Sequence, residues 1–281
     1  MSNDLTSANL LLGVKQVQSN DFLPNKAYAF FSHVIKGQPE NMEMLQTILD
    51  RNICLFDYEC MVDHTPSGRQ RRLVTFGKYA GIAGMIDIFQ AVGQKLLQNG
   101  YSTPFLNSPM CYMYHDLEEA KKGVKEMGRH IAEEGLPPGL EPLVFAFTGK
   151  GNVTRGALDI FHLLPHEMIT LRQLKELKKI EGGGCPQHKV YGLIVEQEHM
   201  VKVRGDKDGF AADVKVAHYR SSPFQYEPTF HKTVAPYVNV LVNGIYWDGR
   251  YPRLLEKHHV RELYENDKKR QVWHFFCMTC C

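Results

Sequence analysis

The stretch LVFAFTGKGNVTRGA, residues 143–157, decides the fold expected for this chain. Its first five residues are apolar, which predicts a buried strand, and the glycines that follow predict a tight turn. After the turn, Val153, Ala157, Ile160 and Phe161 recur at helical spacing. A strand, a glycine turn and a helix in this order aim the helix N-terminus at a pyrophosphate, as in dinucleotide-binding sheets.

The glycines of this turn only partly fit the usual dinucleotide pattern. Gly149 permits the tight turn, and Gly151 lets the backbone approach a phosphate with no Cβ in the way. Thr154 stands where the third glycine usually falls, and Gly156 comes two residues later. The pattern alone therefore leaves open a glycine-rich turn in some other kind of α/β protein.

Apolar runs and helical patterns alternate along the chain, which predicts an α/β fold with parallel sheets. Strands are expected at 9–17, 26–33, 53–58, 72–76, 167–170, 190–195 and 237–247, and helices at 41–52, 78–99, 116–134 and near 269. Asp116 is expected to cap its helix, with Glu119 three residues on. Lys15, His33 and Glu59 follow strands, and in parallel sheets function gathers at the carboxyl ends of the strands.

Composition narrows the possible functions. The 281 residues carry a formal net charge of +2, so no general basic field for nucleic acid is expected. No apolar run is long enough for a membrane span, and no presequence is visible at the N-terminus. Seven scattered cysteines predict reduced thiols in an intracellular protein. Cys277, Cys280 and Cys281 form half of a zinc pattern without a second half, so no metal is expected.

Two basic features have competing interpretations. The loop around residues 64–72 carries His64, Arg69, Arg71 and Arg72, and is either a solvated turn or an anion site for a carboxylate substrate. Arg172 follows the short strand after the glycine-loop helix, where an acid would bind the ribose hydroxyls of NAD. An arginine there suits the 2′-phosphate of NADP, although an ordinary surface arginine is an equal alternative.

Six segments together carry a resemblance to one family. They are LLGVKQV (11–17), AFFSHVIKGQPEN (29–41), FDYECMVD (56–63), RLVTFGKYAGIAGMID (72–87), VFAFTGKGNVTRGA (144–157) and VNGIYW (242–247). In this order and spacing they resemble the saccharopine-forming lysine–2-oxoglutarate reductase portion of α-aminoadipic semialdehyde synthases. More distantly they resemble saccharopine dehydrogenases, alanine dehydrogenase and transhydrogenase. The resemblance covers roughly residues 9–260.

The resemblance implies an NADPH-dependent oxidoreductase that condenses L-lysine with 2-oxoglutarate to saccharopine, the first step of lysine degradation. It implies Lys15 and His33 as catalytic proton carriers, with Glu59 setting their charge balance. Arg72 and Lys36 are expected to bind substrate carboxylates. The implied contacts to NADP(H) are Gly149, Gly151, Asn152, Val153, Arg172, Asn243 and Ile245.

The resemblance also implies two Rossmann-like domains with a cleft between them. We expect a partial catalytic domain at 1–76, a dinucleotide-binding domain at 77–265 and an unmatched tail at 266–281. Both domains are expected to be incomplete at the chain ends. A mitochondrial location is implied, as is a glutamate-forming saccharopine dehydrogenase domain on the full-length polypeptide.

Two alternatives remain open at this point. One is a catalytically incomplete fragment, or nucleotide-binding module, of the same family. The other is an alanine dehydrogenase-type enzyme, against which Arg172 and the absence of an acid after its strand argue mildly.

Overall fold

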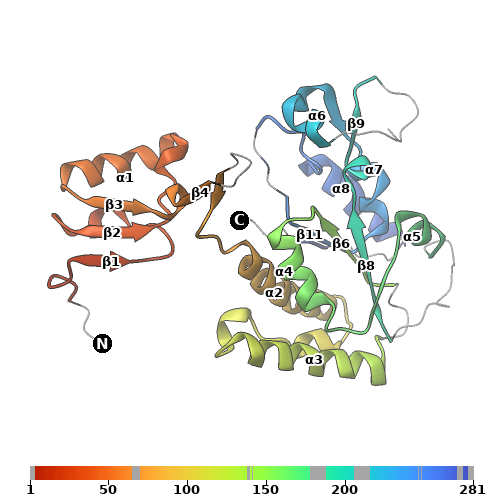
Figure 1. The fold of residues 1–281 in the computed structure, drawn as a ribbon. Helices are drawn as coiled ribbons and strands as arrows, with labels where there is room; N and C mark the ends of the chain where they lie inside the picture. Colours follow the sequence, from red (N-terminus) through yellow and green to blue (C-terminus); the bar gives the residue numbers. More distant parts are fainter. Residues whose placement is uncertain are drawn as a thin grey trace. The chain divides into compact units, whose positions relative to one another are not determined.

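The computed structural model describes residues 4–64, 70–137, 140, 142–177, 188–205, 216–245, 247, 249–270 and 275–277. The predicted half zinc pattern lies largely outside them, because Cys280 and Cys281 are not described. Of the basic loop, residues 65–69 also lie outside. The chain divides into two compact units, Met1–Phe76 and Gly77–Cys281 (Figure 1). Both contain parallel strands with helices, so the predicted α/β class is confirmed.

Unit 1 is built on a three-stranded parallel sheet in the order β1 (Leu10–Leu12), β2 (Ala27–Phe30) and β3 (Cys54–Asp57). Helix α1 (Pro39–Asp50) crosses from β2 to β3, as a parallel connection requires. Short 3₁₀ turns, η1 (Ser19–Asp21), η2 (Val34–Lys36) and η3 (Tyr58–Cys60), complete this part of the unit. The buried core of the unit is small and consists of Phe22, Tyr28, Phe30, Met44 and Ile48.

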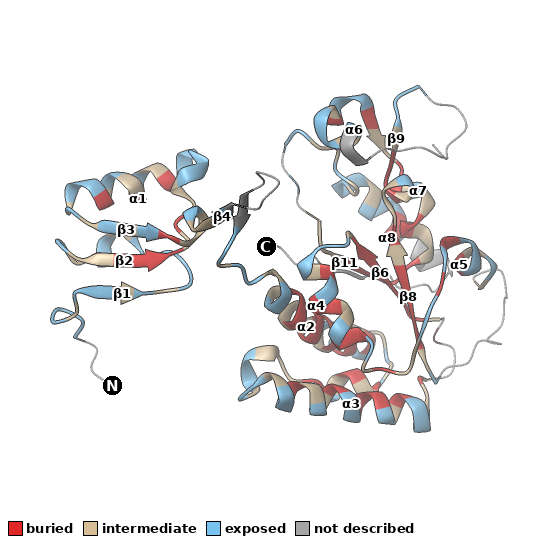
Figure 2. Ribbon diagram, in the orientation of Figure 1, coloured by how far each residue is buried: buried red, intermediate tan, exposed pale blue. Residues whose placement is uncertain are grey.

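One face of this sheet carries apolar side chains that remain exposed. The β1–β2–β3 register puts Leu12, Ala29 and Phe56 on the same face, opposite the α1-facing core. Leu12 is 73% exposed and Phe56 47% exposed, and Figure 2 shows β1 and β3 as largely exposed strands. Parallel sheets are normally covered on both faces, whereas unit 1 by itself covers only one face of this sheet.

The strand predicted at 72–76 is wrong. The structure instead has an antiparallel pair, β4 (Val62–His64) and β5 (Gln70–Arg72), which forms its own two-stranded sheet. The amide of Leu73 still donates to the Met61 carbonyl at 2.8 Å, but residues 73–76 form no strand. A parallel strand would need a long crossover after β3, whereas two segments this close in sequence pair most readily as a hairpin.

Unit 2 contains a five-stranded, all-parallel sheet in the order β12-β11-β6-β8-β7. Its strands are β6 (Val144–Thr148), β7 (His166–Met168), β8 (Val190–Val195), β11 (Val240–Asn243) and β12 (Phe275–Cys277). A small antiparallel pair is formed by β9 (Val201–Val203) and β10 (Tyr226–Pro228). Residues 266–281, expected as an unmatched tail, thus include a strand that pairs with β11.

Helices cover both faces of the unit 2 sheet. The helices are α2 (Gly77–Gln98), α3 (Leu117–Glu134), α4 (Asn152–Phe161), α5 (Leu171–Leu177), α6 (Val216–Ser221), α7 (Phe230–Thr233) and α8 (Lys257–Arg270). Short 3₁₀ turns are η4 (Pro104–Asn107), η5 (Cys111–Met113), η6 (Gln197–His199), η7 (Pro223–Gln225) and η8 (Ala235–Tyr237). One buried core joins α2, α3 and α4 to the sheet, and a second joins α5, α7 and α8 to the other face. The three strands β11, β6 and β8 are correspondingly buried in Figure 2.

The predicted cap of one unit 2 helix is confirmed. Asp116 caps α3 by accepting from the Glu119 amide at 2.8 Å, and the Glu119 carboxylate accepts from the His115 amide at 2.6 Å. A close helix contact lies at Gly81 and Gly156. A Cβ on Gly81 would lie 1.9 Å from the Val153 carbonyl oxygen, and a Cβ on Gly156 would lie 1.9 Å from the Lys78 carbonyl oxygen. Helices α2 and α4 therefore touch backbone to backbone.

Candidate functional site

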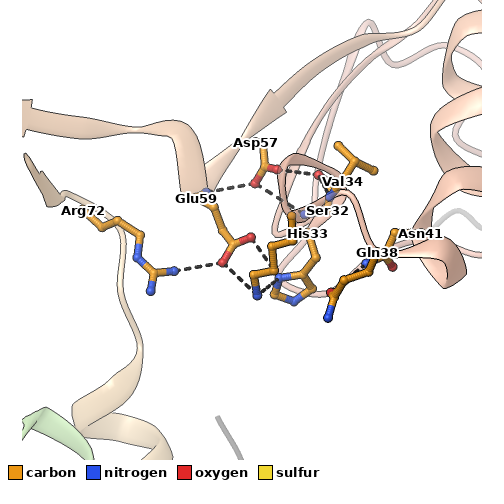
Figure 3. Close-up of polar contacts among 9 residues, drawn as sticks. Ser32, His33, Val34, Gln38, Asn41, Asp57, Glu59 and Arg72 are labelled. Carbon is orange, nitrogen blue, oxygen red and sulfur yellow. Dashed lines mark hydrogen bonds and ion pairs between the residues drawn. The ribbon is translucent and has the colours of Figure 1, made fainter. Parts of the chain in front are cut away.

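Unit 1 gathers charged side chains at the carboxyl ends of β2 and β3 (Figure 3). The Glu59 carboxylate lies at the centre: its Oε2 is 2.9 Å from Nδ1 of His33, and its Oε1 is 3.0 Å from Nη1 of Arg72 and 3.4 Å from Nζ of Lys36. The side chain of Glu59 is only 7% exposed, while those of its three partners are each at least a third exposed. Four of the residues predicted for catalysis and substrate binding are thus brought together.

The backbone around this cluster is held by a second, buried carboxylate. Asp57 accepts from the Glu59 amide at 2.9 Å, which caps η3, and it also accepts from the Ser32 hydroxyl. The Ser32 hydroxyl in turn accepts from the Val34 amide at 3.3 Å. His33, between them, has a left-handed backbone with φ of +60°, which is uncommon for a residue with a side chain. Asp57 and Ser32 therefore position the two residues that form the centre of the cluster.

The proton on His33 has two possible positions in this geometry. Nδ1 lies 2.9 Å from Glu59 Oε2 and also 2.9 Å from Lys36 Nζ. A ring nitrogen either donates or accepts, so it cannot bond to both partners at once. Donation to Glu59 and acceptance from Lys36 are therefore two alternative proton arrangements at one atom, which is what a proton carrier needs.

Lys15 lies at the carboxyl end of β1, beside this cluster in the sheet. Pairing between β1 and β2 continues past the strands, because the Phe31 amide donates to the Val14 carbonyl at 3.2 Å. This places Lys15 at the same sheet edge as Ser32 and His33. Its side chain is exposed and forms no ion pair with any residue that the structure describes. With Lys36 and Arg72 facing one carboxylate, the edge has an excess of positive charge, which suits an anionic substrate.

Unit 2 holds the predicted glycine loop between β6 and α4. Gly149 has a φ of +80°, and a Cβ on it would lie 2.7 Å from Cγ2 of Ile245. Gly151 is the N-cap of α4, which begins at Asn152 and Val153. Thr154, at the place of the usual third glycine, donates from its hydroxyl to the Thr148 carbonyl at 2.9 Å. Gly156 instead serves the contact with α2.

The loop is joined to the end of β11 by hydrogen bonds. The Thr148 hydroxyl donates to the Asn243 side-chain oxygen at 2.8 Å and accepts from the Gly244 amide at 3.1 Å. A Cβ on Gly244 would lie 2.2 Å from the Thr154 hydroxyl oxygen, so only glycine fits there. The two strand ends that were predicted to hold a nucleotide are thus adjacent, as the β6–β11 pairing requires.

A pocket of about 400 Å³ opens at this edge of the sheet. It is lined by Gly149, Lys150, Gly151, Gln197, Met200, Val201, Tyr219, Arg220, Gly244, Ile245, Trp247, Tyr251, Pro252 and Leu254. The order in which strands are added to the sheet reverses here: β7 and β8 lie on one side of β6, and β11 lies on the other. Ligands of open parallel sheets bind at such a point, so the pocket is the candidate dinucleotide site.

Arg172 lies apart from this pocket. It is in α5, after β7, and β7 is the outer strand of the sheet with β8 between it and β6. Its side chain is 90% exposed and pairs with Glu176 at 3.3 Å within the same helix. Arg172 is not among the residues that line the pocket.

Sequence reasoning missed three contributors. Asp57 and Ser32 were not singled out, although both stand at strand ends beside predicted residues. The third is the pair formed by Lys150 of the glycine loop and Glu196, whose Nζ and Oε2 are 2.9 Å apart. Glu196 follows β8 directly, and only the strand order shows that this end lies beside the loop.

Other kinds of site are not found in the described part of the chain. No group of three or more histidine, cysteine, aspartate and glutamate side chains there has a geometry that would hold a metal ion. Within the same described ranges, no helix combines the length and apolar character needed to cross a bilayer.

Fold and site define an α/β protein with a parallel sheet and glycine turn of the Rossmann type in its larger unit. Comparison with known proteins is more specific. The α-aminoadipic semialdehyde synthase of Arabidopsis thaliana is 44% identical over 271 residues, and the mitochondrial α-aminoadipic semialdehyde synthase of Mus musculus is 39% identical over 263. Each match covers 94% of this chain. The chain is a homologue of these synthases, and the resemblance inferred from its sequence is confirmed.

The matches cover only a small part of the relatives' own length. The chain spans about a quarter of the length of these relatives, 25% of the plant protein and 27% of the mouse protein. No protein-family model matches the chain. Among solved structures, an L-alanine dehydrogenase is similar with a TM-score of 0.39 and 13% identity, over 91% of this chain and 53% of that one.

Proposed function

We propose that this chain catalyses the NADPH-dependent condensation of L-lysine with 2-oxoglutarate to saccharopine. The observation that carries the proposal is the cluster of His33, Lys36 and Arg72 around the Glu59 carboxylate, in a chain homologous to α-aminoadipic semialdehyde synthases. The glycine-loop pocket of unit 2 supplies a place for a dinucleotide. The activity is that of an oxidoreductase acting on a CH–NH bond, in lysine degradation.

The reaction joins an amine to a ketone and then reduces the product. The ε-amine of lysine forms a C–N bond to the ketone carbon of 2-oxoglutarate, and the ketone oxygen leaves as water after taking up two protons. When bound, NADPH would supply a hydride to the carbon of the resulting C=N bond, whose nitrogen carries a proton in the reactive iminium form, and NADPH would itself be oxidised. The chain must therefore remove protons from the amine nitrogen and deliver protons to the departing oxygen.

His33 and Lys15 are the proton carriers in this scheme. His33 exchanges a proton at Nδ1, where Glu59 and Lys36 offer an acceptor and a donor at equal distance. Lys15, exposed at the neighbouring strand end, serves the second transfer. Arg72 binds a carboxylate of 2-oxoglutarate or lysine through its two-pronged guanidinium, with Lys36 as a second cation. Glu59 keeps Lys36 and Arg72 close together by offsetting the repulsion between these two cations.

Gly149, Gly151, Asn152 and Val153 hold the cofactor pyrophosphate through backbone amides at the start of α4. Asn243 and Ile245, at the end of β11, would contact the nicotinamide ribose. The proposal extends to a mitochondrial location, which the names of the mouse and rat relatives support. It also extends to a glutamate-forming saccharopine dehydrogenase domain as a partner on a longer polypeptide.

Lysine-dependent oxidation of NADPH tests the proposal. The purified chain is mixed with lysine, 2-oxoglutarate and NADPH, absorbance of the reduced cofactor is followed, and saccharopine is identified by mass. Lys15→Met and His33→Gln are each expected to lower the rate about 10²- to 10⁴-fold, the usual contribution of a positioned proton carrier. Lys26→Met is the matched control, because Lys26 is a half-buried lysine just before the opposite end of β2, where its Nζ donates to the Thr6 carbonyl. Equal rates in all three variants would remove the site assignment.

The open face of the unit 1 sheet favours a second candidate. An apolar face with Leu12 and Phe56 exposed is unusual for a working parallel-sheet enzyme. The second candidate is a catalytically incomplete, nucleotide-binding module of the same family. It predicts that the monodisperse chain binds NADPH but shows no lysine-dependent turnover. The first candidate predicts both NADPH binding and lysine-dependent turnover.

A further inference from the structure

The strand order of unit 2 changes which residue faces the cofactor ribose. In Rossmann-type sheets the ribose nearest the glycine loop is bound from the end of the strand beside the loop strand. Here β6 pairs with β8 through five residues, from Val144↔Tyr191 to Thr148↔Val195, and β7 lies beyond β8. The residue directly after β8 is Glu196, whereas Arg172 follows the outer strand.

Glu196 is held in place by two contacts. Its carboxylate accepts from the His199 backbone amide, and its own amide donates to Nδ1 of His199 at 3.3 Å, which closes η6 as a capping box. Its Oε2 is 2.9 Å from Nζ of Lys150. Lys150 stands between the two loop glycines and lines the pocket, with its side chain 71% exposed. Gln197, next to Glu196, also lines the pocket.

A carboxylate and a lysine at this place favour different cofactors. A carboxylate alone accepts from the ribose hydroxyls of NAD(H) and repels the 2′-phosphate of NADP(H). A lysine alone attracts that phosphate as a compact positive charge. Joined as an ion pair, the acid is neutralised and the lysine is held over the glycine loop.

We infer that Lys150 binds the 2′-phosphate of NADP(H) and that Glu196 positions Lys150 for this contact. The inference rests on the proposed function, because it requires a dinucleotide in the glycine-loop pocket. It transfers cofactor discrimination from Arg172 to the Lys150–Glu196 pair. The Arg172–Glu176 pair lies within α5, and neither residue lines the pocket. Both of its side chains are more exposed than their counterparts in the Lys150–Glu196 pair.

Equilibrium binding of NADPH and NADH to the full chain, followed by cofactor fluorescence or calorimetry, tests the inference without relying on turnover. Lys150→Met is expected to weaken NADPH binding about tenfold, the loss of one charge-assisted hydrogen bond. NADH binding should be unchanged or tighter, since the freed Glu196 carboxylate can accept from the ribose hydroxyls. Glu196→Gln removes the ion pair that holds Lys150, so it should weaken NADPH binding by a smaller factor than Lys150→Met and leave NADH binding unchanged. Lys121→Met, which removes the exposed Lys121–Glu118 pair on α3, is the matched control and should alter neither affinity.

Arg172→Met is the competing variant. A selective loss of NADPH affinity in Arg172→Met, with Lys150→Met unchanged, would overturn the inference and leave the proposed function standing. Equal weakening of both cofactors in Lys150→Met would overturn it too, because Lys150 would then serve the shared pyrophosphate. A wild-type chain that binds neither cofactor would overturn the proposed function, and the inference with it.

Discussion

The two units present their candidate sites by opposite means. In unit 1 the site consists of side chains, since His33, Lys36 and Arg72 meet at Glu59 beside a core of five buried residues. In unit 2 it consists largely of backbone, because Gly149 and Gly244 sit where no Cβ fits. The sheet of unit 2 is covered on both faces, whereas that of unit 1 is covered on one. The most damaging substitutions at the sites should therefore be changes of charged side chains in unit 1 and changes of glycine in unit 2.

The largest effect is expected where helices of unit 2 touch. Gly81→Ala would place a Cβ 1.9 Å from the Val153 carbonyl oxygen, and a backbone atom cannot move aside as a side chain can. We expect the free energy of unfolding to fall by about 3 kcal/mol or more, measured by urea denaturation. Gly151→Ala is the control: nothing lies within 4 Å of its Cβ, so its stability should stay near that of the wild type. Comparable stabilities would show that the α2–α4 contact is looser than described.

The core of unit 1 should respond next. Phe30 is fully buried in that core, so Phe30→Ala is expected to cost about 3 kcal/mol through lost burial and a cavity. Hydrogen exchange followed by mass spectrometry should show faster exchange in peptides of residues 4–64 and unchanged exchange in those of 142–177. Phe145→Ala, in the unit 2 core, is the reciprocal control and should reverse the pattern. Equal acceleration in both units would mean that they unfold as one.

A smaller effect is expected at the charge cluster. Glu59→Gln removes the carboxylate that pairs with Lys36 and Arg72 and bonds to His33, and a hydrogen bond to a charged group is worth about 1.5–3 kcal/mol. Urea denaturation should show a loss of about that size, together with a large loss of the proposed activity. Glu43→Gln, an exposed glutamate on α1, should leave both unchanged. Full activity in Glu59→Gln would separate Glu59 from the chemistry.

The smallest effect is a pH dependence in unit 2. The rings of His231 in α7 and His259 in α8 stack at 3.8 Å, and burial, followed by the charges of neighbouring histidines and Lys232, lowers the pKa of both below the ordinary 6.5. Glu262 opposes this shift at both rings, as Glu256 does at His259. The unfolded state therefore binds more protons just below pH 6.5, so stability should fall as the pH drops through that range and level off below the folded pKa.

This expectation is checked by measuring the urea midpoint between about pH 7.5 and about pH 5. These values lie roughly one pH unit or more on either side of the ordinary pKa of histidine. The double variant His231→Asn, His259→Asn should have a shallower slope. Part of the slope should persist, because burial also lowers the pKa of His162 and His199. A midpoint that rises as the pH falls would contradict the sign of these shifts.

Features set by neighbouring residues could be predicted from the sequence. The apolar run before Gly149 and the run at 190–195 became β6 and β8, and Asp116 became the cap of α3. The cluster at His33 and Glu59 followed from the rule that parallel strands end at one edge. The resemblance to a known family supplied the residues' expected roles.

Features that depend on the order of the strands in a sheet could not be predicted from the sequence. Residues 72–76 look like a strand because they are apolar, yet only Arg72 pairs, and it pairs with β4. Nothing local to residues 166–168 or 190–195 indicates that β8 enters between β6 and β7. The pairing of Lys150 with Glu196, 46 positions apart in the sequence, depends on that insertion. Long-range pairing is chosen by the sheet as a whole, so a single segment carries no signal of it.

The left-handed backbone of His33 has a consequence for how this protein can change. A residue with a side chain in that conformation costs about 1 kcal/mol that glycine would avoid. His33→Gly would therefore stabilise the backbone, but it would remove the imidazole. Selection for robustness alone would favour glycine at position 33. Under the proposed function, His33 exchanges some backbone stability for an imidazole at the centre of the cluster, and the rest of unit 1 must be stable enough to tolerate this cost.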